Sequence, residues 1–528
     1  MKFIFITGGV ASSIGKGITA SSIGMLLKAR SYEVNMVKID PYLQIDAGTM
    51  SPYEHGEVFV TEDGGETDLD IGNYERFINK NLTKKNNITA GKIYWNILLK
   101  ERKGEYLGKT VQIIPHVTNE IKSTLFSFGK KSDVVIVEIG GTIGDIESQP
   151  FIEAVRQIKK DIGKNNVLYI HVSLLPFLRT SNEIKTKPTQ HSVRELRGMG
   201  IQPDLLICRS EIPLNEGVKD KLSLFCDVEK QAIIEAHNAK TIYEIPLIFE
   251  QQNLGNIITE KLFSERKPPD LTHWKKFVEK VLNPKRFITV GIVGKYTHMK
   301  DAYLSIIEAL THAGAVFNSA VKIKWIESEN VGIEDPHKIF KDVDGILIPG
   351  GFGTRGIEGK IKTVHYARQS NTPFLGICLG LQCAVIEFAR NVCKLTKANS
   401  TEFDPITPYP VIDILPTQKK VVNKGGTMRV GSYLAILKDG TKTKEIYRTK
   451  EVSERHRHRY EVNPEYKDLL EKNGLIVSGE SPDGKLVEFI EIPKHKFFIA
   501  TQSHPEFKSR PTNPSPLFVA FIKACSEL

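Results

Sequence analysis

Residues 3–17, FIFITGGVASSIGKG, lead from an apolar run into a glycine-rich turn and set the fold expected for the first half of the chain. The run FIFIT lacks the alternation of a half-exposed strand, which is typical of a strand buried on both faces. Similar runs occur at 133–141, 166–173 and 203–210, with segments of helical length between them. Buried strands alternating with helices predict a parallel α/β sheet with helices on its faces.

The turn GGVASSIGKG favours a phosphate site. Its backbone N–H groups and the start of the next helix can hold polyphosphate, and Lys16 adds positive charge. Two features depart from the usual P-loop spacing: Gly9 lies one residue too far from Gly15, and Gly17 stands where Ser or Thr would bind magnesium. The alternative is a glycine-rich turn without a ligand.

Carboxylates must therefore hold any magnesium ion here. Asp70 in TEDGGETDLD and Glu138 in EIGGTIGDIES are the metal-ligand candidates, because magnesium prefers hard oxygen ligands. Acidic clusters that only solvate loops are the alternative. In KTKPTQHSVRELR, Lys185, Lys187 and Gln190 lie just before a predicted helix and offer a second anion site. On charge alone, the alternative of a solvated basic loop is somewhat favoured.

The second half repeats the pattern, with apolar runs at 288–296, 321–327, 344–353 and 372–380, and predicts a second α/β layer sandwich. At 528 residues, the chain is long enough for two large domains. The polar stretch 264–286 contains three prolines and marks the junction. We expect a nucleotide-dependent domain at 1–265, a linker at 266–285 and a second domain at 286–528.

A thiol site is predicted in this second domain. TPFLGICLG places Cys378 where a strand turns into a helix, in the GxCxG form of a nucleophile elbow. In TQSHPEF, His504 can serve as the base, and Glu506 can orient its imidazole. The glycine turn 349–353 and the N–H group of Leu379 could bind an oxyanion. A lone cysteine usually packs inertly, but these parts together favour acyl transfer; Cys383 and Cys393 are expected to be buried.

Composition limits the partners. The net charge of +10 favours anionic ligands, but Lys and Arg are spread along the chain without a nucleic-acid-binding signature, so no nucleic acid is expected. The six cysteines form no CxxC pair, which fits a reducing compartment, and a cytoplasmic protein is expected. No signal peptide or apolar stretch of bilayer length is visible, so no membrane partner is expected.

Several segments together resemble the CTP synthase family nearly from end to end, and GxCxG with a later HPE resembles class I glutamine amidotransferases. The segments that carry the resemblance are GGVASSIGKG, the stretch 38–70, GTIGDIES, KTKPTQHSVRELR, IPGGFGTRG, GICLGLQ and ERHRHRYEVN.

The resemblance implies a set of ligands for each half. The residues expected at ATP are Ser13, Ile14, Gly15, Lys16, Gly17, Ile18, Lys38 and Asp70. Those expected at UTP or the product CTP are Ser12, Asp145, Ile146, Glu147, Lys185, Thr186, Lys187, Pro188, Thr189, Gln190 and Lys221. Those expected at glutamine are Gly351, Leu379, Gly380, Leu381, Gln382, Glu402 and Arg459.

The resemblance also implies a reaction and its control. ATP would phosphorylate UTP at its 4-oxygen with Mg²⁺ bound by Asp70 and Glu138, and ammonia from glutamine would displace the phosphate. Cys378, His504 and Glu506 would release that ammonia into an internal passage gated by His55. GTP would activate the enzyme, with Arg355 as a contact, CTP would inhibit it, and the chain would form homotetramers that can stack into filaments.

Three other kinds of protein share parts of this pattern. Another ATP-dependent amidotransferase could combine a deviant P-loop with a glutaminase half, but the segment KTKPTQHSVRELR argues against it. A filament-forming scaffold with a decayed active site would be expected to lack Cys378, His504 or a magnesium carboxylate, and all of these are present. A P-loop switch protein that only binds partners would not need a complete glutaminase site.

Overall fold

A computed structural model describes residues 1–415 and 428–526 and divides the chain into two compact units. The first unit contains Met1–Ala47 and Asp70–Val278, and the second contains Gly48–Leu69 and Glu279–Leu528. This division differs from the one expected from sequence, because residues 48–69 lie in the second unit although they belong to the predicted first domain. We call residues 48–69 the crossing segment.

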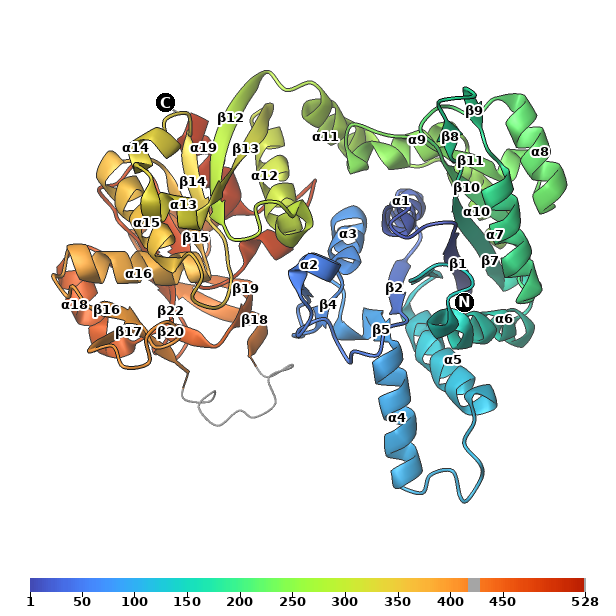
Figure 1. The fold of residues 1–528 in the computed structure, drawn as a ribbon, viewed down its shortest axis with the longest axis horizontal. Helices are drawn as coiled ribbons and strands as arrows, with labels where there is room; N and C mark the ends of the chain where they lie inside the picture. The colour runs from blue at the N-terminus through green and yellow to red at the C-terminus, as the bar shows by residue number, and fades with distance from the viewer. Residues whose placement is uncertain (416–427, 527–528) are drawn as a thin grey trace. The chain divides into compact units, whose positions relative to one another are not determined.

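The first unit is built on a seven-stranded, wholly parallel sheet (Figure 1). Its strands, in spatial order, are β11 (Ile233–Ala236), β10 (Leu205–Arg209), β7 (Val167–Leu174), β1 (Lys2–Gly9), β6 (Val134–Ile139), β2 (Val34–Asp40) and β5 (Asn87–Thr89). The predicted parallel α/β sheet is confirmed.

Helices cover both faces of this sheet. Phe3 and Phe5 of β1 point into a core with helices α4 (Ala90–Arg102), α5 (Thr118–Ser127) and α6 (Gln149–Ile162). Ile4 and Ile6 are also fully buried but lie outside that core, because successive side chains of a strand point to opposite faces. Helix α1 (Lys16–Lys28) contacts β1, β2 and β6 from this second face.

The second unit holds a nine-stranded mixed sheet (Figure 1). Its parallel part runs β13 (Ser319–Glu327), β12 (Arg286–Gly294), β14 (Gly345–Ile348), β15 (Phe374–Ile377) and β23 (Phe498–Thr501). It continues antiparallel through β22 (Val487–Glu491), β21 (Ile476–Glu480), β18 (Arg429–Leu437) and β19 (Glu451–His458).

Two hydrophobic cores lie on opposite faces of this sheet. Ile346 and Ile348 of β14 pack into one core with helices α15 (Ile357–Ser370) and α16 (Leu379–Asn391). Leu347 packs into the other core with helices α12 (Leu304–Val316) and α19 (Pro516–Ser526). A second α/β layer structure, as expected from the apolar runs, is therefore present.

The predicted linker 266–285 contains a packed helix, α11 (Thr272–Leu282). Trp274 is only 5% exposed, and its indole N–H donates to the Tyr243 carbonyl at 2.8 Å. Phe277 lies edge-on to the Tyr243 ring, with 5.1 Å between the centroids. Most of this stretch is therefore part of the first unit rather than a free connection.

The crossing segment is held inside the second unit by strand β19. It contains two short antiparallel strands, β3 (Phe59–Val60) and β4 (Glu66–Thr67). Arg455 donates to the Val60 carbonyl at 2.8 Å, and Arg457 donates to Glu66 Oε1 at 2.7 Å. Arg455 and Glu66 are nearly fully buried, so the segment is an integral part of this unit.

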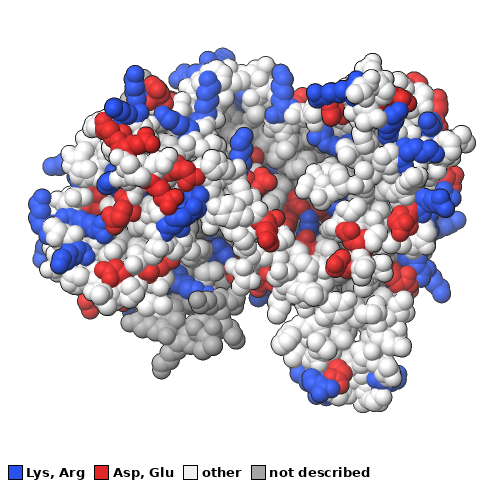
Figure 2. Space-filling view, viewed as in Figure 1, with Lys and Arg blue, Asp and Glu red and all other residues white. Residues whose placement is uncertain are grey.

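Surface charge and hydropathy add two observations. Lys and Arg side chains are interspersed with Asp and Glu side chains on the face drawn in Figure 2. Among the described residues, no helix combines the length and apolar character needed to cross a membrane.

Candidate active site

Cys378 lies in a sharp turn between β15 and α16. Its φ of +52° and ψ of −100° are strained for a residue with a side chain, and its N–H donates to the Thr501 carbonyl at 2.7 Å. The glycines of GxCxG are needed because a Cβ on Gly380 would approach the Ile348 carbonyl oxygen to 2.4 Å, and one on Gly376 would approach Gly380 to 2.8 Å.

His504 and Glu506 lie just after β23. Glu506 Oε1 is 2.7 Å from His504 Nδ1, and both side chains are buried. Burial opposes the charged imidazole, but the charges of Glu506 and of a Cys378 thiolate raise the pKa of His504 to about 10. His504 Nε2 has no hydrogen-bond partner in the described part of the chain, so it is available for proton transfer. The Phe507 ring stacks on the imidazole at 5.2 Å.

The glycine turn 349–353 brings this histidine and the cysteine to one place. A Cβ on Gly350 would lie 2.7 Å from His504 Cε1 and 3.5 Å from Cys378 Cβ. A cavity of about 230 Å³ opens here, lined by Cys378, His504 and Gly351 together with Met50 and Val58 of the crossing segment.

One of the predicted glutamine ligands, Gly351, lines this cavity, and the others differ in burial. Leu379, Gly380, Leu381 and Gln382 form the buried first turn of α16. Glu402 Oε1 accepts from the Gly353 N–H at 2.8 Å, and burial raises the pKa of this carboxyl. Arg459 directly follows β19 and is half-buried.

Sequence reasoning missed two side chains at the thiol. Gln502 Nε2 lies 3.5 Å from Cys378 Sγ, and the sequence signal was its place two residues before His504. The Lys360 side chain is buried in α15, with its Nζ 3.8 Å from the Cβ position of Gly351. Burial lowers the pKa of Lys360 to about 8. A lysine in an amphipathic helix gives no sign of such burial.

In the glycine-rich turn of the first unit, contacts explain why Gly17 stands where a P-loop has Ser or Thr. A Cβ on Gly17 would lie 2.0 Å from Asp70 Oδ1, so the carboxylate occupies the space of a Ser or Thr side chain. Lys16 is buried, and its Nζ donates to the Gly141 carbonyl at 2.5 Å. Burial lowers the pKa of Lys16.

Asp70 and Glu138 converge on one cation. The Lys38 ammonium lies 2.5 Å from Asp70 Oδ2 and 2.9 Å from Glu138 Oε1, and Tyr74 donates to Glu138. Burial raises the pKa of Glu138, and Lys38 opposes this shift. In residues 1–415 and 428–526, no three or more His, Cys, Asp or Glu side chains gather as a metal site, but two hard oxygen donors facing one cation position fit Mg²⁺ with water and phosphate.

The predicted UTP segments meet near the same turn. Ser192 of α7 (Lys187–Gly198) packs on Gly9, because a Cβ there would lie 1.6 Å from Ser192 Oγ. Gln190 is buried and donates to Thr186 Oγ1 at 3.0 Å. Asp145 Oδ2 accepts from the Thr142 N–H at 2.6 Å.

The other predicted nucleotide ligands differ in exposure. Ser12, Ser13, Asp145, Ile146, Glu147, Lys187 and Lys221 are exposed. Gly15, Ile18, Lys185 and Pro188 are half-buried. Ile14, Lys38, Thr186 and Thr189 are buried. The exposed set can meet a ligand without rearrangement of the core.

Arg355 and His55 both lie in the second unit. Arg355 follows the glycine turn, and its guanidinium donates to the Lys295 carbonyl at 2.8 Å and to the Tyr53 hydroxyl at 3.5 Å. Tyr53 and His55 belong to helix α2 (Pro52–His55) of the crossing segment. The Tyr53 side chain therefore connects Arg355, the candidate GTP contact, to the short helix that carries His55, the candidate gate.

Comparisons with known proteins cover both units. The family description "CTP synthase N-terminus" matches residues 2–263, and "Glutamine amidotransferase class-I" matches residues 298–524. The chain is 65% identical to a CTP synthase of Methanocaldococcus jannaschii over 99% of this chain and 98% of that one. It is 64% identical to a CTP synthase of Methanococcus maripaludis over all of both chains. A solved glutaminase domain of Trypanosoma brucei CTPS with bound acivicin is 36% identical, with a TM-score of 0.43, over 46% of this chain and 94% of that one.

Proposed function

The chain belongs to the CTP synthase family, and we propose that it aminates UTP to CTP, using ATP and ammonia that it releases from glutamine at Cys378. This assigns it to the carbon–nitrogen ligases of pyrimidine biosynthesis that carry a glutamine amidotransferase domain. The cytoplasmic location stays a prediction from the cysteine content.

Glutamine hydrolysis uses the thiol site. The Cys378 thiolate attacks the side-chain amide carbon, and the carbonyl oxygen becomes an oxyanion at the glycine turn and the Leu379 N–H. His504 gives a proton to the departing nitrogen as the C–N bond breaks. His504 then takes a proton from water, which hydrolyses the thioester to glutamate. The contact of 2.7 Å with Glu506 supports this role, because it holds the imidazole in one orientation.

Amination of UTP uses the glycine-rich turn of the first unit. ATP transfers its terminal phosphoryl group to the uracil 4-oxygen, and ammonia then displaces phosphate from carbon 4. Lys16 and Lys38 would supply the positive charge that neutralises the transferring group. Asp70 and Glu138 would hold Mg²⁺, which when bound supplies further positive charge. The proposed ATP and UTP ligands are those predicted from the resemblance.

Regulation and assembly are part of the proposal. GTP activates through Arg355, and the link from Arg355 through Tyr53 to α2 supports an effect on the His55 gate. CTP inhibits by competing at the UTP ligands. The chain works as a homotetramer, which can stack into filaments.

The observation that carries the proposal is the strained Cys378 elbow beside a buried His504–Glu506 pair, in a chain related over its whole length to CTP synthases. The test measures CTP formation from UTP, ATP and magnesium with either glutamine plus GTP or ammonium chloride. We expect CTP from both nitrogen sources. Absence of CTP with ammonium chloride would refute the synthase assignment.

Two variants separate the sites. Cys378→Ala should lose glutamine-dependent synthesis and keep ammonia-dependent synthesis, whereas Lys16→Ala should lose both. If folded Cys378→Ala protein lost ammonia-dependent synthesis as well, the two-site scheme would be wrong.

A further inference from the structure

We propose that Gln502 is a further catalytic residue of the thiol site, a fixed hydrogen-bond donor to the Cys378 thiolate. The proposal rests on the glutaminase chemistry given above. It assigns to Gln502 a role that neither the elbow nor the His504–Glu506 pair supplies.

The side chain lies against the reacting atom. Gln502 is fully buried, and its Nε2 is 3.5 Å from Cys378 Sγ. Its backbone N–H donates to the Glu488 carbonyl at 2.9 Å, which fixes the start of the side chain next to β22.

Neighbouring groups fix which end of the amide faces the sulfur. The Tyr460 carbonyl can only accept, so the group 3.0 Å from it is the NH₂ of Gln382. The same NH₂ lies 3.3 Å from Gln502 Oε1. A flipped Gln502 would place its NH₂ against that donor, so the oxygen must face Gln382 and the NH₂ must face Cys378.

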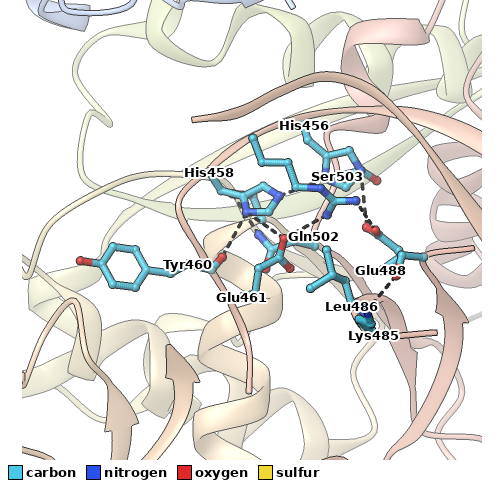
Figure 3. A network of polar contacts seen from close by, with 12 residues as sticks. His456, His458, Tyr460, Glu461, Lys485, Leu486, Glu488, Gln502 and Ser503 are labelled. Atoms are coloured by element: carbon cyan, nitrogen blue, oxygen red, sulfur yellow. Dashed lines mark hydrogen bonds and ion pairs between the residues drawn. The ribbon is translucent and has the colours of Figure 1, made fainter. Parts of the chain in front are cut away.

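A buried polar network ties the surrounding strands together. Arg429 donates to Glu488 at 2.6 Å and to Glu461 at 2.9 Å. His456 lies 3.4 Å from Glu488 and 3.0 Å from the His458 ring (Figure 3). Glu488 is also the residue whose carbonyl binds the Gln502 backbone. The amide is therefore held in place before substrate arrives, as an effective catalytic donor must be.

The chemistry needs such a donor. A hydrogen bond to the sulfur favours the thiolate over the thiol, both before attack and when hydrolysis of the thioester releases it. An amide N–H keeps its proton at all working pH values, so Gln502 does not compete with His504 in proton transfer.

The test measures alkylation of Cys378 by iodoacetamide in the full-length protein, followed by peptide mass spectrometry across pH. Gln502→Met keeps the length of the side chain and removes the donor. We expect the pH midpoint of alkylation to rise by about one unit, and the rate at pH values below that midpoint to fall about ten-fold, because a hydrogen bond to a charged group has roughly this effect.

Two further variants sharpen the result. Gln502→Glu keeps the size and the acceptor for Gln382, and its ionised carboxylate has no donor, so at alkaline pH it should slow alkylation at least as much. Ser503→Ala is the matched control: Ser503 is equally buried on the same loop, but its hydroxyl bonds Thr501, and this variant should react like the native protein.

An unchanged alkylation profile in both folded Gln502 variants would overturn the inference, even if glutamine turnover fell. Ammonia-dependent CTP synthesis reports folding in each case. The proposed function fails on a different result, namely glutamine turnover that survives in Cys378→Ala.

Discussion

Phe59 shows how strongly the second unit depends on residues from the first part of the sequence. Its side chain is fully buried, lies edge-on to Phe507 at 5.1 Å, and has the Arg455 guanidinium 5.4 Å from its ring. Phe507 in turn stacks on His504. Phe59→Ala removes this support, and a buried Phe→Ala change costs about 3–5 kcal/mol. The equilibrium constant for unfolding of the second unit should therefore rise roughly 100- to several-thousand-fold.

Hydrogen–deuterium exchange measures this effect strand by strand. In Phe59→Ala, the amides of β19 and β23 should exchange faster, whereas those of β1 in the first unit serve as an internal control and should not change. Glutamine-dependent synthesis should fall more than ammonia-dependent synthesis, because Phe507, which stacks on the His504 imidazole, loses the side chain that it packs against. Phe59→Leu, with a smaller change of volume, should show a weaker effect. Unchanged exchange in β19, or faster exchange confined to β1, would refute this reasoning.

Three further predictions concern buried charges. Because the folded pKa of His504 is raised to about 10, its charge should stabilise the protein fully below pH 6.5 and lose this effect as pH rises through 10, so the urea stabilities of native protein and His504→Asn should converge over that range. Lys38→Met leaves Asp70 and Glu138 without their shared cation and should cost about 3–5 kcal/mol, part of which MgCl₂ should restore in thermal unfolding; no extra gain over the native protein would argue against magnesium at these carboxylates. Burial lowers the pKa of Lys360 to about 8, so the unfolded chain binds more protons above that pH and stability should rise with pH from about 8 to 10.5; Lys360→Met should lack this rise in urea titrations.

The parallel strands could be predicted because both faces of each sheet are covered. Runs such as FIFIT need no alternation when both sides are buried, and each run that follows this pattern is a strand. The elbow at Cys378 could be predicted because its signal, GxCxG, lies within five consecutive residues, although the backbone that excludes a side chain at Gly380 belongs to Ile348 of a neighbouring strand.

Other features depend on contacts between distant parts of the chain. The strands β3 and β4 have two residues each, too short for any periodicity, so nothing in the sequence separates them from the first unit. The contact of Gln502 with Cys378 exists only once β15 and β23 pair. Helix α11 did carry a signal, because Trp274, Phe277 and Val278 follow helical spacing within the polar stretch.

The crossing segment has a consequence for how this polypeptide can be divided. The backbone passes between the two units three times, at 47–48, 69–70 and 278–279. A gene split after codon 278 would encode residues 48–69 in the N-terminal fragment. The C-terminal fragment, residues 279–528, would then lack Val60 and Glu66, the partners of Arg455 and Arg457. One proteolytic cut at the 278–279 crossing would nick the protein without freeing its parts. Only a rearranged gene that carries codons 48–69 along with codons 279–528 would encode the second unit whole.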